Sequence, residues 1–287
     1  MPETQSPKPG ASSAGKLQGA RAPDFIVIGA MRSGTTSLYS YITEHPKVMP
    51  AGKKEIRYFD RNYEQGRQWY RAFFPPAKAF PGVITGEASP SYLLHPLAPR
   101  RIRAEHPGVK LIVALRDPVD RAYSHYQLST RMGREDLTFE QALDREAERL
   151  DGELERFTSD EHHKSAAYWN QSYVTRGMYA DQLRRWLDVF PREQFLVIGS
   201  EGLFADPPGV MREVYAWLGV EAHTLAECKK VNMAPHASYA PMAPETRQRL
   251  ADFFRARNQA LYALLGMDFG WDAAGPSIPP HIVRQLG

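Results

Sequence analysis

A short segment near the start of the chain has the residue types of an anion-binding loop. Gly29 and Gly34 have the spacing of a phosphate-binding loop, and Thr35 and Thr36 follow them. Backbone N–H groups in such a loop, and at the start of the helix after it, can bind the oxygens of a phosphate or sulfate. Arg32 lies inside the loop and adds a full positive charge. The segment therefore predicts a site for an anionic group.

The residue at position 35 bears on which anion this is. Phosphate loops that cleave nucleoside triphosphates carry a lysine there, whereas this chain has Thr35 and places its cation at Arg32. We therefore expect a phosphate-bearing donor other than magnesium-bound ATP. Two other classes remain open: a P-loop kinase or NTPase acting on a small molecule, and a non-catalytic module that binds a nucleotide or a glycan. Glycine-rich turns also occur only to pack a helix against a sheet, but packing alone does not explain Arg32.

The hydrophobic pattern predicts the strands and helices that would position this loop. Continuous apolar runs predict strands at residues 25–30, 110–115 and 194–198, with a weaker candidate at 83–87. Helical spacing predicts helices at residues 35–44, 119–131, 179–190 and 210–218. Buried strands that alternate with helices form a parallel sheet covered on both faces. The expected fold class is α/β, a P-loop-like three-layer α/β/α architecture with a central parallel sheet.

The expected site follows from this architecture. Ligands of such sheets bind at the carboxyl ends of the strands, so we expect the loops after Ile28, Glu87 and Leu115 to converge there. Two other segments are strongly charged: residues 138–156 are expected to form one exposed helix, and residues 245–265 a closing helix.

The domain organisation is expected to be simple. No linker in the body of the chain is long enough to divide it, so residues 23–287 are expected to form a single domain. Residues 1–22 are rich in Pro, Gly, Ser, Ala and Lys and predict a disordered tail.

Composition disfavours several functional classes. A net charge of +3 and a pI of about 8.9 are too mild to indicate a nucleic-acid partner. Cys228 is the single cysteine, so it cannot form an intramolecular disulfide, and a reducing compartment, the cytosol, is expected. The longest apolar run, residues 25–31, has the length of a strand, so no membrane span or signal peptide is predicted.

Several separated motifs resemble the sulfotransferases that use 3'-phosphoadenosine 5'-phosphosulfate (PAPS), especially the branch with heparan sulfate N- and O-sulfotransferases and their bacterial relatives. The matching segments, in chain order, are PDFIVIG at 23–29, RSGTTSL at 32–38, KKEIRYFD at 53–60, Trp69-Tyr70 with Phe73-Phe74-Pro75, GEASPSY at 86–92, RDPVDRAYS at 116–124, and RGMY at 176–179 with Leu183 and Trp186. Each motif alone is modest. Their order makes the resemblance specific over about residues 23–270.

The resemblance implies an enzyme that moves the sulfuryl group of PAPS to a hydroxyl or amine of an acceptor. The donor has two anionic ends, so two anion sites are needed. The resemblance assigns the 5'-phosphosulfate to the loop formed by Arg32, Ser33, Gly34, Thr35, Thr36 and Ser37. It assigns the 3'-phosphate to Arg116 and Ser124, with help from an N–H-rich helix start. The other interpretation of Arg116 is a surface ion pair with Asp120.

The catalytic assignments also come from the resemblance. Arg32 would neutralise charge on the leaving phosphate, which needs no metal ion. Glu55 matches the family's catalytic glutamate and is the expected base that takes the acceptor's proton. His125 is the second candidate for the base. A histidine found in some relatives near this point aligns with Leu128 here, so its role cannot be transferred.

Less specific expectations concern the loop at residues 229–239 and the acceptor. Relatives present a basic stretch to the nucleotide where this chain has Lys229, Lys230 and His236. The acceptor is expected to be a carbohydrate, or a glycosylated or small metabolite, contacted by variable loops at 62–79 and 130–173. Four aromatic residues in these loops would either stack on a sugar or belong to the core: Trp69, Tyr70, Tyr168 and Trp169. The oligomeric state cannot be inferred from the sequence.

Overall fold

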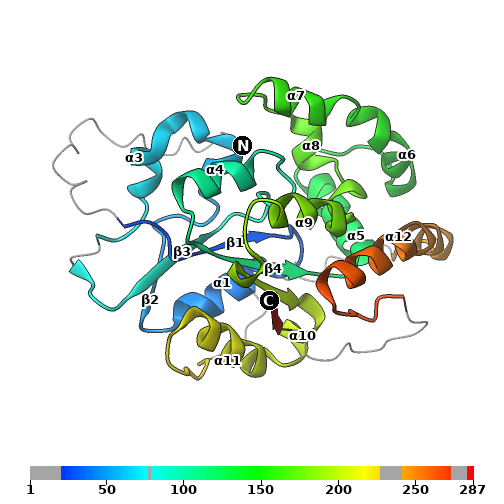
Figure 1. Cartoon of the computed structure of the whole chain (residues 1–287). Coiled ribbons are helices and arrows are strands. Elements are labelled where there is room, and N and C mark those ends of the chain that lie inside the picture. The colour runs from blue at the N-terminus through cyan, green and yellow to red at the C-terminus, as the bar shows by residue number, and fades with distance from the viewer. Residues whose placement is uncertain (1–20, 77–78, 227–240, 273–282) are drawn as a thin grey trace.

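The computed structural model describes residues 21–76, 79–226, 241–272 and 283–287. Within these residues six strands form one sheet, with helices on both faces (Figure 1). The strands are β1 (Phe25–Gly29), β2 (Val48–Pro50), β3 (Ile84–Ala88), β4 (Lys110–Leu115), β5 (Phe195–Gly199) and β6 (Val283–Gln285). This arrangement confirms the three-layer α/β/α architecture.

The strand order is β2-β3-β1-β4-β5-β6. Strands β1 to β5 pair in parallel, whereas β6 pairs antiparallel with β5 at the edge. The sheet is therefore parallel, as expected, except for the antiparallel strand β6 at one edge. From β1 the chain passes first to β2 at one edge and returns to β3 beside β1, and it then crosses to β4 and β5 on the other side of β1. The boundary between β1 and β4 is thus the switch point at which ligands of such sheets bind.

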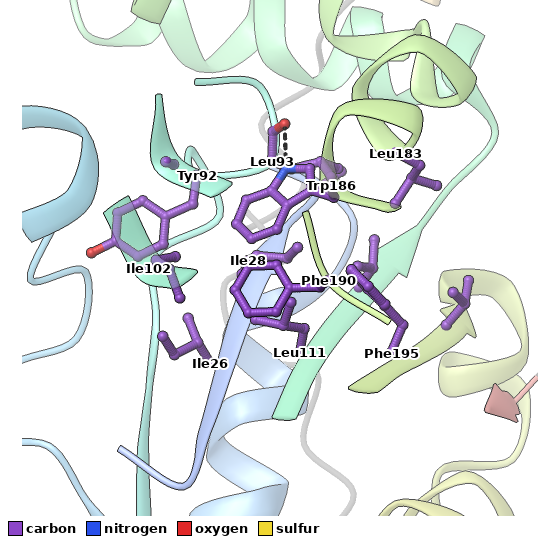
Figure 2. Packing of buried hydrophobic residues seen from close by; sticks show 14 of the residues in the cluster. Ile26, Ile28, Tyr92, Leu93, Ile102, Leu111, Leu183, Trp186, Phe190 and Phe195 are labelled. Carbon is purple, nitrogen blue, oxygen red and sulfur yellow. Dashed lines mark hydrogen bonds between the residues drawn. The ribbon is translucent and has the colours of Figure 1, made fainter. Parts of the chain in front are cut away.

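Two hydrophobic layers sandwich the sheet. Ile26 and Ile28 of β1 point into one layer and Phe25 and Val27 into the other, as the alternation of side chains along a strand requires. Figure 2 shows the first layer, where the Trp186 ring lies over the strands and its indole N–H donates to the Leu93 carbonyl at 3.1 Å. Each fully buried large apolar side chain stabilises the fold by about 1.5–3 kcal/mol.

Helices of two groups cover the two faces of the sheet (Figure 1). Those on the side of Phe25 and Val27 are α1 (Thr35–Glu44), α10 (Ser200–Ala205) and α11 (Pro207–Leu218). Those on the opposite side are α2 (Tyr58–Arg61), α3 (Gly66–Arg71), α4 (Ala98–Glu105), α9 (Tyr179–Leu187) and α12 (Pro244–Leu265). Short 3-10 turns lie at Tyr63–Gln65, Thr175–Gly177 and Arg192–Gln194.

A further group of helices packs beside the sheet around a smaller core, and part of it differs from expectation. Its members are α5 (Pro118–Arg131), α6 (Phe139–Arg149), α7 (Glu153–Ser159) and α8 (Ala166–Asn170). The single exposed helix predicted at 138–156 is instead α6 and α7, divided just before Gly152, whose φ of 69° breaks the helix. The α6 helix is also partly buried, since Phe139 and Glu146 face the interior.

The predicted tail and the predicted absence of a membrane span concern the start of the chain and its helices. Residues 1–20 of the predicted tail lie outside the described part of the chain. None of the described helices has the length and apolar character needed to cross a membrane.

Candidate transfer site at the switch point

The loop after β1 has the backbone of an anion site. Arg32 and Gly34 have positive φ angles of 72° and 78°. A side chain at position 34 would also place its Cβ 2.8 Å from the Phe204 ring, so glycine is required for space as well. The first internal bond of α1 runs from the Leu38 N–H to the Gly34 carbonyl, and no side chain caps this helix start. The N–H groups of Thr35 and Thr36 therefore point along the helix axis toward the loop.

The two predicted anion sites meet at one contact. The Nε–H of Arg32, in the loop after β1, donates to the Ser124 hydroxyl, on the helix after β4, at 3.0 Å. These two elements flank the switch point between β1 and β4. The structure therefore brings together two residues that the sequence assigned to opposite ends of one donor.

Arg116 lies at the carboxyl end of β4, as expected. Its backbone carbonyl accepts from the Tyr179 hydroxyl at 2.9 Å, and its side chain is about one-third exposed. The ion pair with Asp120 is a long one, with 4.0 Å between the nearest atoms, whereas Arg247 contacts Asp120 at 2.6 Å. Exposed pairs of this kind contribute little. The Arg116 guanidinium is therefore only weakly engaged by Asp120.

The start of α5 differs from expectation. The Asp117 carboxylate caps this helix and accepts the N–H groups of Val119 and Asp120 at 2.7 and 3.1 Å. Burial, and then the nearby Asp120, raises the pKa of Asp117 to about 6. The amide groups that were expected to share a phosphate with Arg116 are thus already occupied, and only the side chains of Arg116 and Ser124 remain for that role.

A backbone hydrogen bond holds Glu55 at the carboxyl end of β3, the same end of the sheet as the loop after β1. Its N–H donates to the Ala88 carbonyl at 3.0 Å, and Ala88 pairs in register with Val27, two residues before the loop. The Glu55 side chain is 46% exposed, and the Lys54 ammonium lies 3.1 Å from its carboxylate. The Glu55 carboxylate is therefore accessible from solvent, as a general base must be.

His125 occupies a different environment from Ser124, its neighbour in the sequence. It is 1% exposed and its ring packs edge-on against Tyr173, with ring centroids 4.9 Å apart. Burial, and then the charges of Arg176 and Arg121, holds its pKa well below the usual value. The structure therefore places this histidine, neutral, in the interior, whereas the Glu55 side chain is 46% exposed.

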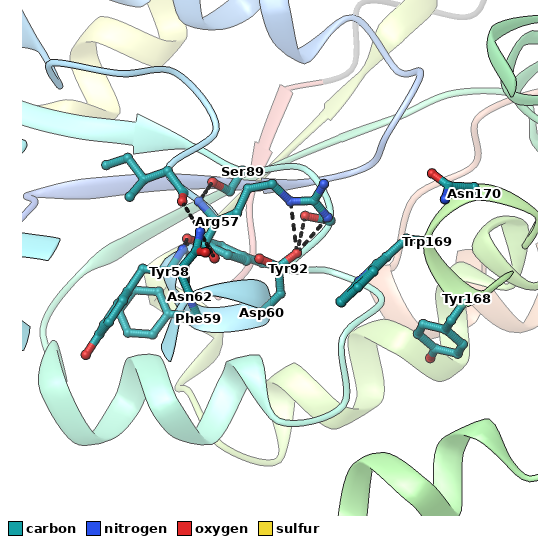
Figure 3. Close-up of polar contacts among 12 residues, drawn as sticks. Arg57, Tyr58, Phe59, Asp60, Asn62, Ser89, Tyr92, Tyr168, Trp169 and Asn170 are labelled. Atoms are coloured by element: carbon teal, nitrogen blue, oxygen red, sulfur yellow. Dashed lines mark hydrogen bonds and ion pairs between the residues drawn. The ribbon is translucent and has the colours of Figure 1, made fainter. Parts of the chain in front are cut away.

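A cationic cluster next to Glu55 was not identified from the sequence. Arg57 donates to Asp60 at 2.9 Å, and its side chain lies near the Trp169 ring in Figure 3. The Arg61 guanidinium lies 3.8 Å from the centre of the same ring. Burial, followed by the charge of Arg57, lowers the pKa of Arg61 to about 10. Asp60 offsets one of these two cations, so the three side chains carry a net positive charge, which favours an anionic partner at this surface.

Of the four aromatic residues considered as sugar contacts, three are buried and one is partly exposed. Tyr70 and Tyr168 are 0% and 5% exposed and belong to the core. Trp169 is 8% exposed and lies beneath Arg57 and Arg61. Trp69 is only half-buried and packs against Phe73, with ring centroids 4.8 Å apart.

The remaining predicted residues have a mixed placement. Lys229, Lys230 and His236 lie outside the described residues. Ser33 and Ser37 are fully buried beneath the loop. The described part of the chain contains no group of three His, Cys, Asp or Glu side chains able to hold a metal ion.

These features define a class of protein. A helix-start loop with an internal arginine, a second arginine at the end of the neighbouring strand, and an exposed carboxylate suit an α/β enzyme that transfers a group from an anionic donor. The chain belongs to the sulfotransferase family, because the profile of the sulfotransferase domain matches residues 22–249. The resemblance inferred from the motifs is thereby confirmed.

Individual relatives agree with this assignment. The chain is 33% identical over 291 residues to heparan sulfate glucosamine 3-O-sulfotransferase 3B1 of Mus musculus, covering 93% of this chain and 69% of that protein. It is 34% identical over 274 residues to the 3A1 enzyme of Homo sapiens, covering 87% and 62%. The crystal structure of a sulfotransferase from Alicyclobacillus acidocaldarius matches with a TM-score of 0.72 at 31% identity, covering 88% of this chain and 100% of that one. The chain is thus a sulfotransferase that spans about two thirds of the length of these curated relatives.

Proposed function

We propose that this sulfotransferase moves the sulfuryl group of PAPS to a hydroxyl of a glycan, with Glu55 as the general base. The observation that carries the proposal is the Arg32–Ser124 contact of 3.0 Å at the switch point. It supports a single donor whose phosphosulfate lies in the loop after β1 and whose 3'-phosphate lies between Ser124 and Arg116. A nucleoside triphosphate has no 3'-phosphate to occupy that second position.

The reaction is an in-line displacement at sulfur. The acceptor oxygen attacks the sulfur atom, the bond between sulfur and the bridging phosphate oxygen breaks, and the acceptor proton passes to the Glu55 carboxylate. The products are a sulfate ester and adenosine 3',5'-bisphosphate. Arg32 stabilises the negative charge that develops on the leaving phosphate, and the N–H groups at the start of α1 contribute to the same task. Because arginine keeps its proton, its role is electrostatic.

The acceptor assignment is supported by the surface beside Glu55. Arg57 and Arg61 lie there, and because Asp60 is paired with Arg57 the three side chains leave a net positive charge; the relatives at 33% and 34% identity are named for heparan sulfate. A glycan that carries carboxylate or sulfate groups would pair with these arginines while presenting a hydroxyl to Glu55. An uncharged metabolite would gain nothing from them.

The experiment that tests the donor class is calorimetric titration with adenosine 3',5'-bisphosphate, beside ATP with magnesium. We expect the bisphosphate to bind and Arg116→Ala to weaken it by about 10- to 100-fold, the cost of one charge-assisted contact. Asp120→Asn is the matched control, and its dissociation constant should stay within about twofold of wild type because the Arg116–Asp120 pair is long and exposed. Binding of ATP and not the bisphosphate would overturn the proposal.

A further inference from the structure

A buried carboxyl group lies close to the segment that carries Glu55, and the proposed reaction does not use it. Glu87, near the carboxyl end of β3, is 0% exposed. Three hydroxyl groups donate to its carboxylate: Tyr70 at 2.9 Å, Ser89 at 2.7 Å and Tyr92 at 3.0 Å. Burial raises its pKa to about 7, against the opposing effect of these three donors. A carboxyl group so costly to bury calls for a role.

Two of the three hydroxyl groups connect Glu87 to the segment that carries Glu55. The Ser89 oxygen accepts the backbone N–H of Arg57 at 3.1 Å, and the Tyr92 oxygen accepts the N–H of Tyr58 at 2.8 Å. A hydroxyl group has a single proton, so donation to Glu87 fixes its orientation and turns its lone pairs toward the segment. Figure 3 shows Ser89 and Tyr92 beside Arg57 and Tyr58. By orienting these two hydroxyl groups, the Glu87 carboxylate determines where two backbone groups of residues 55–58 are held.

The segment needs such support because of its backbone conformation. Glu55 and Arg57 have φ angles of 56° and 57°, in the left-handed region. Residues with a Cβ atom rarely adopt this region unless the surroundings enforce it. The conformation sets the direction in which the Glu55 side chain leaves the chain, so its loss would move the carboxylate relative to the donor loop.

We propose that Glu87 is a positioning residue that acts through Ser89 and Tyr92 to hold residues 55–58 in the conformation that presents Glu55 to the acceptor. This inference rests on the proposed role of Glu55. Tyr70 contacts the segment differently: its hydroxyl donates to the same carboxylate, but its contact with the segment is made by its ring, which stacks on Tyr58 with centroids 4.7 Å apart. Its ring, and not its hydroxyl, supports the segment.

Tyr70 therefore provides a matched control. Tyr92→Phe and Tyr70→Phe each remove one hydroxyl group from a fully buried tyrosine that donates to the same oxygen of Glu87. Only Tyr92→Phe also removes an acceptor of a backbone N–H in the segment. Ser89→Ala removes the other acceptor and serves as a second variant.

The experiment combines hydrogen exchange with kinetics. We expect the Tyr58 amide to exchange about tenfold faster in Tyr92→Phe than in wild type. The Arg57 amide should exchange faster by the same factor in Ser89→Ala. Each variant removes the buried oxygen that accepts the N–H in question. Transfer from PAPS to heparan sulfate should show a kcat lowered at least about fivefold in both variants, with the dissociation constant of adenosine 3',5'-bisphosphate unchanged. Tyr70→Phe should leave all three quantities within about twofold of wild type.

The outcomes separate this inference from the proposed function. Unchanged exchange of the Tyr58 amide in Tyr92→Phe would overturn the positioning role, whatever the activity of a Glu55 variant. An equal fall of kcat in Tyr92→Phe and Tyr70→Phe would also overturn it, since the effect would then be general destabilisation. Full activity of Glu55→Gln would overturn the proposed base instead.

Discussion

Arg32 and Ser124 lie 92 positions apart in the chain, yet the Nε–H of one donates to the hydroxyl oxygen of the other at 3.0 Å. The contact joins the loop after β1 to the helix after β4, the two elements at the switch point of the sheet. It fixes the direction of the Arg32 side chain within a loop that already has two positive φ angles. The charge that would stabilise the leaving phosphate is therefore preorganised by the fold.

Arg32→Ala is expected to lower kcat by about 10²–10³-fold, because it removes an electrostatic contact made to charge that develops in the transition state. Arg32→Lys restores the charge but not the planar Nε–H donor to Ser124, so its kcat should lie between those of Ala and wild type. Steady-state kinetics with PAPS and heparan sulfate measure both. A kcat for Arg32→Ala within twofold of wild type would contradict this assignment.

His125→Asn is expected to lower stability without removing catalysis. The ring is buried against Tyr173, so the smaller side chain should cost about 1–3 kcal/mol in the free energy of unfolding. The folded variant should retain the wild-type pH profile of kcat, because the buried and neutral histidine is not accessible from solvent. Thermal unfolding and a pH–rate profile check this, and a lost limb of the profile would restore His125 as a base.

His95 gives a prediction for acid stability. It is 2% exposed, and burial lowers its pKa to about 3, so the folded protein keeps it neutral where the unfolded chain protonates it. Its contribution is complete above the unfolded pKa of about 6.5 and is lost as the pH falls, by about 1.4 kcal/mol per pH unit. Between pH 7 and pH 5, wild type should therefore lose about 2 kcal/mol more stability than His95→Asn.

The controls for this prediction follow from the other titrating groups. The raised pKa values of Glu87 and Asp117 increase the free energy of unfolding as the pH falls, which opposes the effect of His95. The informative quantity is therefore the difference in stability loss between wild type and His95→Asn. His162→Asn removes an exposed histidine and is the control for the chemical change from imidazole to amide. Denaturant unfolding at the two pH values measures all three proteins. Parallel losses in wild type and His95→Asn would show that His95 does not carry the effect.

Much of the fold was predictable because its central strands are buried on both faces. The runs that became β1, β4 and β5 are apolar almost throughout, which is the pattern of such strands. The edge strands β2 and β6 have three residues each and lack a pattern strong enough to identify. The break between α6 and α7 depends on Gly152, a residue that a helix can also tolerate, so composition alone did not reveal it.

The site also contains residues that the sequence could predict and residues that it could not. Arg32, Glu55, Arg116 and Ser124 belong to ordered motifs, and the structure places all four at or near one edge of the sheet. The side chain of His125 could not be placed, because adjacent residues on a helix point in different directions and only the packing shows which one is buried. The network around Glu87 includes bonds between residues 32 and 34 positions apart, from Arg57 to Ser89 and from Tyr58 to Tyr92, and no local pattern encodes these.

The central claim is tested most directly by transfer of a radiolabelled sulfuryl group from PAPS to heparan sulfate, with wild type beside Glu55→Gln. We predict labelled glycan and an equal amount of adenosine 3',5'-bisphosphate from wild type, a rate about 10²–10⁴-fold lower for Glu55→Gln, and unchanged donor binding. Glu64→Gln, at a carboxylate already paired with Lys164 at 2.7 Å, should keep the wild-type rate. Equal rates for wild type and Glu55→Gln, or no labelled glycan from wild type, would contradict the account.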